Sequence, residues 1–193
     1  TYVPLNATLG FKASPVNGLW FNANPADIRT KDSYITAKDA DGNEIGTFDN
    51  KMKGTKTEGD RTYDSDIVIY RLAEMYLFKA EAYAALNQTP QAIIELNRVR
   101  DRAKIGTYSG STNKIAVEKE ILNERARELY LERKRWPDLL RFHYGGTIDV
   151  YQEVPNLKKK VDDNIITPLY LAIPLSDINI NPNLKQTQGY ENL

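Results

Sequence analysis

The clearest helical pattern in the chain is Arg71-Leu72-Ala73-Glu74-Met75-Tyr76-Leu77-Phe78-Lys79-Ala80-Glu81-Ala82, near its middle. Between residues 67 and 86 the polar side chains are few, and at helical spacing they cover an arc of about 160°. The other positions are apolar or alanine, so we expect a helix over 67–86 that is buried on most of its sides. The preceding Asp64-Ser65-Asp66 is typical of a helix N-terminus, because these side chains accept hydrogen bonds from free backbone N–H groups.

A second helix is predicted after a short turn. Asn87-Gln88-Thr89-Pro90 ends the first helix, and proline suits the first turn of a new one because it lacks an N–H. This helix is expected from about Pro90 to Ala103, with an apolar stripe of Ala92, Ile93, Leu96 and Val99. The pair has the pattern of a tetratricopeptide unit, although any antiparallel helical hairpin would look similar. Because one such unit cannot bury its faces alone, we expect the chain to be part of a larger helical protein or to self-associate.

Further helices are predicted on the C-terminal side of this hairpin. A third helix is expected from about Lys114 to Arg135, where Trp136-Pro137-Asp138 interrupts it and a short helix over Asp138–Phe142 follows. Residues 147–168 form a predicted polar loop, and the tail after Pro174 is rich in turn residues. The sequence therefore predicts a mainly α domain over residues 64–193 with an extended tail.

The N-terminal residues 1–63 have a different character. They are rich in Gly, Asn, Asp, Thr and Pro and show no helical period. Short strands are predicted at Tyr34–Ala37 and Glu44–Phe48, joined by a turn in which Gly42 supplies a positive φ. This segment cannot bury a core of its own. We therefore expect residues 1–63 to be a loop-rich region with little sheet that lies against the helices and carries the ligand-binding residues.

Composition excludes several classes of function. The 26 Lys+Arg and 26 Asp+Glu give a formal net charge of +0, whereas a nucleic-acid-binding protein would show a basic surplus. The absence of cysteine excludes disulfides, zinc-thiolate and iron–sulfur sites and a thiol nucleophile within this chain. With His143 as the only histidine, we expect neither a metal nor a cofactor. No apolar run approaches the roughly 18 residues of a membrane span. The start at Thr1 carries no signal peptide, so either processing has occurred or this is a piece of a longer chain.

Four motifs of the chain resemble those of the SusD/RagB family and occur in the same order. They are the helix over 71–82, the run Leu96-Asn97-Arg98-Val99-Arg100-Asp101-Arg102-Ala103, the charged stretch from Ile121 to Arg141, and the segment from Ile173 to Tyr190. Asp27-Ile28-Arg29 also resembles the family's DxR element. The chain departs from the pattern at Arg133, where glycine is common, and at Thr187-Gln188, where Asn-Pro is common.

The resemblance implies a helical fold with tetratricopeptide-like repeats, of which this chain would be the C-terminal portion. Members of the family are bacterial outer-membrane lipoproteins that are exposed on the cell surface. They bind glycans or other nutrients and deliver them to a SusC-type TonB-dependent transporter. The family's lipid-bearing cysteine has no counterpart here, so membrane association is expected only through an anchor that this chain lacks. No enzymatic activity is expected, and the alternative is a tetratricopeptide-like adaptor that binds a protein segment.

Candidate ligand-binding residues lie in the irregular N-terminal part. Sugar rings stack their C–H faces on aromatic rings, while amides, carboxylates and arginine bond to the sugar hydroxyl groups. Such a set is formed by Trp20, Phe21, Asn22, Asp27, Arg29 and Tyr34. Trp20 is the strongest candidate, because indole offers the largest platform. The alternative is that Trp20 and Phe21 anchor the loop onto the helices.

The charged residues of the family motifs are expected to be structural. Arg71 and Glu74 stand one helical turn apart and are expected to pair. The alternative is a glycosidase-type carboxylate pair made of Glu124 and Glu128. Neighbouring arginines argue against it, because a general acid needs a raised pKa. The expected structural ion pairs involve Arg71, Glu74, Glu124, Arg125, Glu128 and Arg135.

Overall fold

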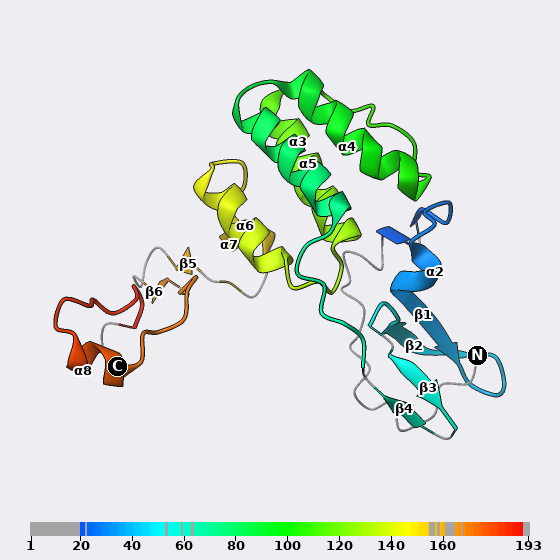
Figure 1. Ribbon diagram of the computed structural model, residues 1–193, viewed down its shortest axis with the longest axis horizontal. Coiled ribbons are helices and arrows are strands. Elements are labelled where there is room, and N and C mark those ends of the chain that lie inside the picture. Colours follow the sequence, from blue (N-terminus) through cyan, green and yellow to red (C-terminus); the bar gives the residue numbers. More distant parts are fainter. Residues whose placement is uncertain are drawn as a thin grey trace. The chain divides into compact units, whose positions relative to one another are not determined.

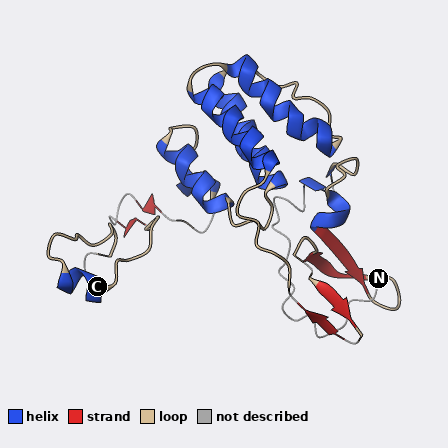
Figure 2. Cartoon of the chain, in the orientation of Figure 1, coloured by secondary structure: helices blue, strands red, loops and turns tan. Residues whose placement is uncertain are grey.

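The computed structural model describes residues 20–190, apart from residues 22, 53, 59, 63, 155–156, 158, 161–164 and 167. It divides the chain into two compact units, residues 1–138 and 139–193. In the part that the structure describes, helices dominate and the short strands form antiparallel pairs (Figures 1 and 2). The mainly α fold predicted from the sequence, with little sheet, is therefore confirmed.

Three helices form the core of the first unit. α3 (Leu72–Ala85) and α4 (Thr89–Ala103) form a hairpin, and α5 (Lys114–Glu128) packs against both (Figure 1). Small and branched apolar side chains close the interfaces between them. The fully buried members include Leu77, Ala80 and Ala84 of α3, Ala92 and Leu96 of α4, and Val117 and Ile121 of α5. The predicted helical hairpin is thus confirmed.

The first helix of the hairpin begins at Leu72, later than the predicted start at residue 67. The Asp64 carboxylate and the Ser65 hydroxyl do not cap it. They accept hydrogen bonds, at 2.8 and 2.9 Å, from the backbone N–H groups of Thr55 and Gly54. The prediction of a helix N-terminus at Asp64-Ser65-Asp66 was wrong, because the first two side chains bond to backbone N–H groups of an earlier segment instead.

The helix α3 is less enclosed than the sequence predicts. One of its sides is fully buried, but Leu72 and Met75 are 68% and 42% exposed. The residues just before the helix add Ile67 and Ile69, which are 61% and 63% exposed. These four apolar side chains are therefore left exposed at and before the start of the helix. This agrees with the expectation that a single helical hairpin cannot bury all of its faces.

The helix α5 ends at Glu128 rather than continuing to Arg135. Leu131 and Arg133 take left-handed backbone conformations, with φ of 61° and 59°, and a right-handed helix cannot continue through them. Because glycine adopts this conformation at least cost, the finding gives a physical reason for glycine at the position of Arg133 in the motif that the chain resembles.

The helix α6 (Arg135–Tyr144) begins directly after this turn and crosses the boundary between the two units. Pro137 lies in its first turn, where a missing N–H costs no hydrogen bond. Trp136-Pro137-Asp138 therefore belongs to the start of a helix, and the prediction that it interrupts one was wrong.

The second unit continues with short elements. They are α7 (Val150–Glu153), the strand pair β5 (Lys159–Lys160) and β6 (Ile165–Ile166), and α8 (Leu175–Ile180). α7 lies within the segment predicted as a polar loop. It forms because the Asp149 carboxylate caps it by accepting a hydrogen bond from the Tyr151 N–H at 3.1 Å.

Two strand pairs precede the helical core. They are β1 (Tyr34–Lys38) with β2 (Glu44–Asp49), and β3 (Thr55–Thr57) with β4 (Asp60–Thr62). The turn between β1 and β2 contains Gly42 at a φ of 88°, so the predicted hairpin is confirmed. A single helical turn, α2 (Thr30–Ser33), leads into β1. The division of the chain at residue 63 into a ligand-bearing region and a helical domain stays a prediction.

Candidate functional site

Three of the predicted ligand-binding residues lie together before α2. The Trp20 Nε1–H donates a hydrogen bond of 3.1 Å to the Asp27 carboxylate. Arg29 binds the same carboxylate through two nitrogens, at 2.8 and 2.7 Å. The backbone holds this segment on the end of α4, because the Ile28 N–H donates to the Ala103 carbonyl at 3.1 Å. Asp27 therefore has a fully buried side chain whose oxygens face protein groups.

The helix α5 supplies the other side of this cluster. Arg29 reaches Glu124 at 2.7 Å and Glu128 at 3.0 Å with the same nitrogen. Arg127 binds Glu124 at 2.7 Å, and its guanidinium lies 3.8 Å from the centre of the Trp20 ring. One face of the indole is therefore covered by a cation, in the geometry of a cation–π contact. Trp20 itself is only half-buried.

At the C-terminal end of α5, carboxylates form ion pairs with arginine and lysine side chains from distant parts of the chain. Glu128 accepts hydrogen bonds from Arg71 and Arg102 in addition to Arg29. Glu132, just beyond α5, pairs with Arg71 at 2.9 Å and with Lys51 at 2.5 Å. The segment before β3 and the segment before α3 are thereby both tied to the same turn of the helix.

These contacts lower the pKa values of Glu128 and Asp27. Burial opposes ionisation of Glu128, but the positive charges of Arg71, Arg102 and Arg29 outweigh it, so its pKa lies below the ordinary value. The pKa of Asp27 is lowered in the same way, because the hydrogen bonds from Arg29 and Trp20 overcome the effect of burial. Both carboxylates are therefore ionised at neutral pH and are unsuited to act as general acids.

A second buried ion cluster centres on Arg125, whose side chain is fully buried. Its guanidinium binds Asp138 at 2.8 Å and Glu74 at 3.3 Å, and it lies 4.3 Å from the centre of the Phe78 ring. Lys134 approaches the same Glu74 carboxylate at 3.2 Å. Three helices, α3, α5 and α6, thus meet through this one side chain.

The observed partners differ from those expected from helical spacing. Arg71 pairs with Glu128 and Glu132, and Glu74 pairs with residues of α5 and the following turn, rather than with each other. Arg135 donates a hydrogen bond of 3.1 Å to the Leu122 carbonyl. The reason is that Arg71 precedes the first turn of α3, so its side chain does not share a helix face with Glu74.

The remaining predicted ligand-binding residues are placed as follows. Phe21 is 1% exposed, and its ring meets Tyr130 edge to face with centroids 6.4 Å apart. Tyr34 is the first residue of β1, but its side chain lies outside the described part of the structure, as does Asn22. The structure therefore brings Trp20, Asp27 and Arg29 together, and the assignment of the six residues to a ligand stays a prediction.

Sequence reasoning did not single out Arg127 or Lys51, although both join the cluster. A signal for Arg127 was available, since it stands one helical turn from Glu124. No local signal pointed to Lys51, which binds Glu132 from a position 81 residues away in the sequence. Among the described residues, no group of three or more His, Cys, Asp or Glu side chains is arranged to hold a metal ion.

The ion cluster predicts a dependence of stability on pH. Asp27 and Glu128 have folded-state pKa values below their ordinary 3.8 and 4.5, so they stabilise the fold above these values. That contribution is lost as the pH falls through the lowered folded-state values. We expect the free energy of unfolding, measured with urea from neutral pH to below 3.8, to decrease steadily once the pH drops below 4.5. Glu128→Gln should show a shallower decrease, and an equal slope would contradict the role of Glu128.

A family model described as the SusD family matches residues 6–190. The starch-binding protein SusD of Bacteroides thetaiotaomicron is 35% identical over 157 residues, which cover 78% of this chain and 26% of that protein. SusD-like protein P38 of Formosa agariphila is 32% identical over 135 residues, covering 66% of this chain and 25% of the relative. The chain thus spans about a quarter of the length of these relatives.

Solved structures show the same likeness. A SusD superfamily protein of Bacteroides fragilis NCTC 9343 matches with a TM-score of 0.63 and 25% identity, over 90% of this chain and 39% of its own. Another, from Bacteroides vulgatus ATCC 8482, matches with a TM-score of 0.61 and 27% identity, over 86% and 38%. The predicted SusD-like fold is therefore confirmed. Within the described residues, no helix has the length and apolar character needed to cross a membrane.

Proposed function

Because the chain belongs to the SusD family, we propose that it is part of a bacterial cell-surface protein that binds a glycan or another nutrient without transforming it. The observation that carries this proposal is the family match over residues 6–190. A relative named a starch-binding protein makes a glycan the first ligand to test. The proposed full-length protein is an outer-membrane lipoprotein that delivers its ligand to a SusC-type TonB-dependent transporter.

The charge arrangement supports binding rather than catalysis. The buried carboxylates of α5 are neutralised by arginines, and Glu128 has a lowered pKa, whereas a glycosidase needs one carboxylic acid that keeps its proton. The chain as a whole has a formal net charge of +0. An uncharged glycan fits such a protein better than a strongly charged ligand does.

Affinity electrophoresis tests this proposal. The purified chain is run through native gels that contain soluble starch, xylan, mannan or a mixed-linkage glucan, beside a polysaccharide-free gel and an albumin standard. We expect at least one polysaccharide to retard the chain and not the standard, with no release of reducing ends on incubation. Unchanged migration in every gel would contradict a glycan as the ligand.

Trp20 remains the leading residue for contact with the ligand. Its indole is half-buried, with Arg127 over one face and the N–H bonded to Asp27. We expect Trp20→Ala to weaken glycan affinity about tenfold, as loss of a stacking ring would, while the helical circular dichroism signal stays unchanged. Trp20→Phe keeps a ring but loses the N–H, and it should retain most of the affinity. Calorimetry showing equal affinity for Trp20→Ala and the unsubstituted chain would remove Trp20 from the site.

A further inference from the structure

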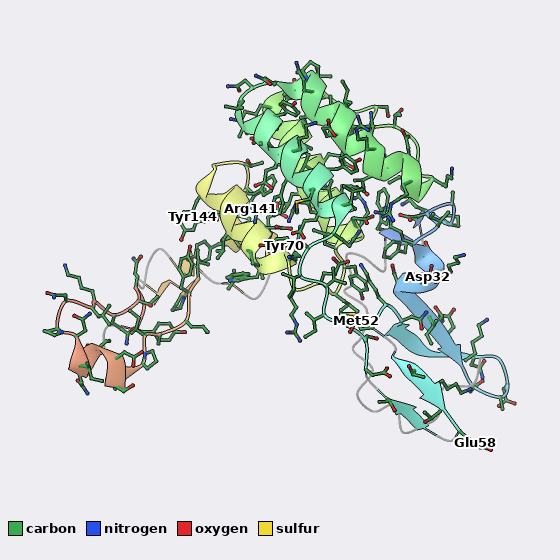
Figure 3. The ribbon with its side chains drawn as sticks, in the orientation of Figure 1. Asp32, Met52, Glu58, Tyr70, Arg141 and Tyr144 are labelled. Carbon is green, nitrogen blue, oxygen red and sulfur yellow. The ribbon has the colours of Figure 1, made fainter. Side chains whose placement is uncertain are left out.

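The second unit carries a pair of exposed aromatic rings. Tyr144 lies at the end of α6 (Figure 3). It is 62% exposed, and Tyr170, which lies between β6 and α8, is 53% exposed. Their rings are nearly parallel, with an interplanar angle of 14° and centroids 6.4 Å apart. The two residues are 26 positions apart in the sequence and belong to the same compact unit. We call Tyr144 and Tyr170 the tyrosine pair.

Both residues of the tyrosine pair are more than half exposed. At a centroid separation of 6.4 Å, two parallel rings are offset rather than superposed, so neither ring fully covers the other. A hydrogen bond between the two phenols joins them and raises the pKa of Tyr144. The pair thus combines apolar faces with polar edges.

His143, the only histidine of the chain, lies against Tyr144 of the tyrosine pair. The His143 ring packs against Tyr144 with centroids 5.2 Å apart, and it meets Tyr151 of α7 edge to face at 6.0 Å. The Val150 N–H donates to His143 Nδ1 at 3.4 Å. Asp149, whose side chain is 40% exposed, places a carboxylate oxygen 3.9 Å from the same nitrogen. His143 thus links the Tyr144 ring to the start of α7.

We propose that the tyrosine pair is a glycan-contacting platform in the second unit, separate from the Trp20 cluster, on which neighbouring sugar rings of a neutral oligosaccharide stack. This inference rests on the proposed function. Two parallel rings match the repeated C–H faces of successive sugar residues, and the phenols offer hydrogen-bond partners for their hydroxyl groups.

The test compares matched tyrosine variants of the full chain. The probe is the polysaccharide that most retards the unsubstituted chain among starch, xylan, mannan and mixed-linkage glucan. We expect the double variant Tyr144→Ala/Tyr170→Ala to lose about tenfold in affinity. Tyr144→Phe/Tyr170→Phe keeps both rings and should lose less than the alanine variant. Tyr70→Ala is the control, because Tyr70 is 66% exposed and lies in the first unit.

Each outcome separates the platform from the proposed function. A loss in the alanine variant that the phenylalanine variant and Tyr70→Ala do not share supports the platform. Full affinity of the alanine variant overturns the platform and leaves glycan binding standing, as does an equal loss in Tyr70→Ala. Failure of every polysaccharide to retard the unsubstituted chain overturns both the platform and glycan binding. Thermal unfolding followed by circular dichroism verifies that all variants keep the helical fold. If the double alanine variant does not fold, Tyr170→Ala alone decides the question, because Tyr170 lies outside the helices and its loss removes one ring of the pair.

Discussion

Replacing Arg125 by methionine is expected to lower the free energy of unfolding by about 3–5 kcal/mol, because it removes the cation that two buried carboxylates share. Asp138 and Glu74 lie 2.8 and 3.3 Å from the guanidinium, and the side chains of all three residues are 0–2% exposed. Methionine fills a similar volume, so the effect isolates charge from packing. The loss is large relative to the total stability of a typical domain, about 5–15 kcal/mol.

Urea unfolding followed by circular dichroism measures this effect. Arg98→Met is the matched control, since Arg98 also binds a carboxylate, Glu95 at 3.1 Å, but its side chain is 53% exposed. The control should cost less than about 1 kcal/mol, as exposed ion pairs do. Adding Glu74→Gln and Asp138→Asn to Arg125→Met should recover part of the lost free energy of unfolding, because the two side chains are then uncharged. Equal costs for Arg125→Met and Arg98→Met would show that the buried pairs do not stabilise the fold.

Replacing Glu128 by glutamine is expected to lower the free energy of unfolding by about 2–4 kcal/mol. The variant keeps the size of the side chain but leaves Arg29 and Arg71 without the carboxylate between them. Arg102 contributes less to the effect, because its side chain is 57% exposed and water screens its charge. Repulsion among the remaining guanidinium groups adds to the loss.

The same variant tests whether α5 holds the Trp20 cluster in place. Arg29 connects Asp27 to Glu128, so its loosening should speed amide hydrogen exchange over residues 20–33 more than in α4. Asp101→Asn on the exposed side of α4 is the control and should change stability by less than about 0.5 kcal/mol. Unchanged exchange over residues 20–33 with a lowered stability would mean that the segment is held by Phe21 and the backbone instead.

Local pattern predicted the helical hairpin well and its boundaries less well. The apolar stripe of α4 and the proline in its first turn act over a few residues, so they are visible in the sequence. The end of α5 was missed because leucine and arginine are good helix formers, and nothing in their identity shows that Leu131 and Arg133 turn left-handed. The true start of α3 was missed because the side chains of Asp64 and Ser65 accept hydrogen bonds from the backbone of Thr55 and Gly54 rather than from the helix.

The candidate site was predicted as a list of residues but not as an arrangement. Trp20, Asp27 and Arg29 were grouped because their chemistry suits a sugar, and the structure shows that they first bind one another and α5. Arg127 covers a face of the very ring chosen as the platform. The tyrosine pair of the second unit gave no local signal, since neither residue stands in a repeated pattern.

By itself, the sequence determined the helical class, the hairpin of α3 and α4, the β1–β2 turn at Gly42, and the motifs of the SusD family. These features depend on side chains within one or two turns of each other, where spacing alone decides the contact. Only the tertiary structure decided which arginine meets which carboxylate and which tyrosines align. Arg29 and Glu124 are 95 residues apart, and their contact exists only after packing brings α5 against the segment before α2.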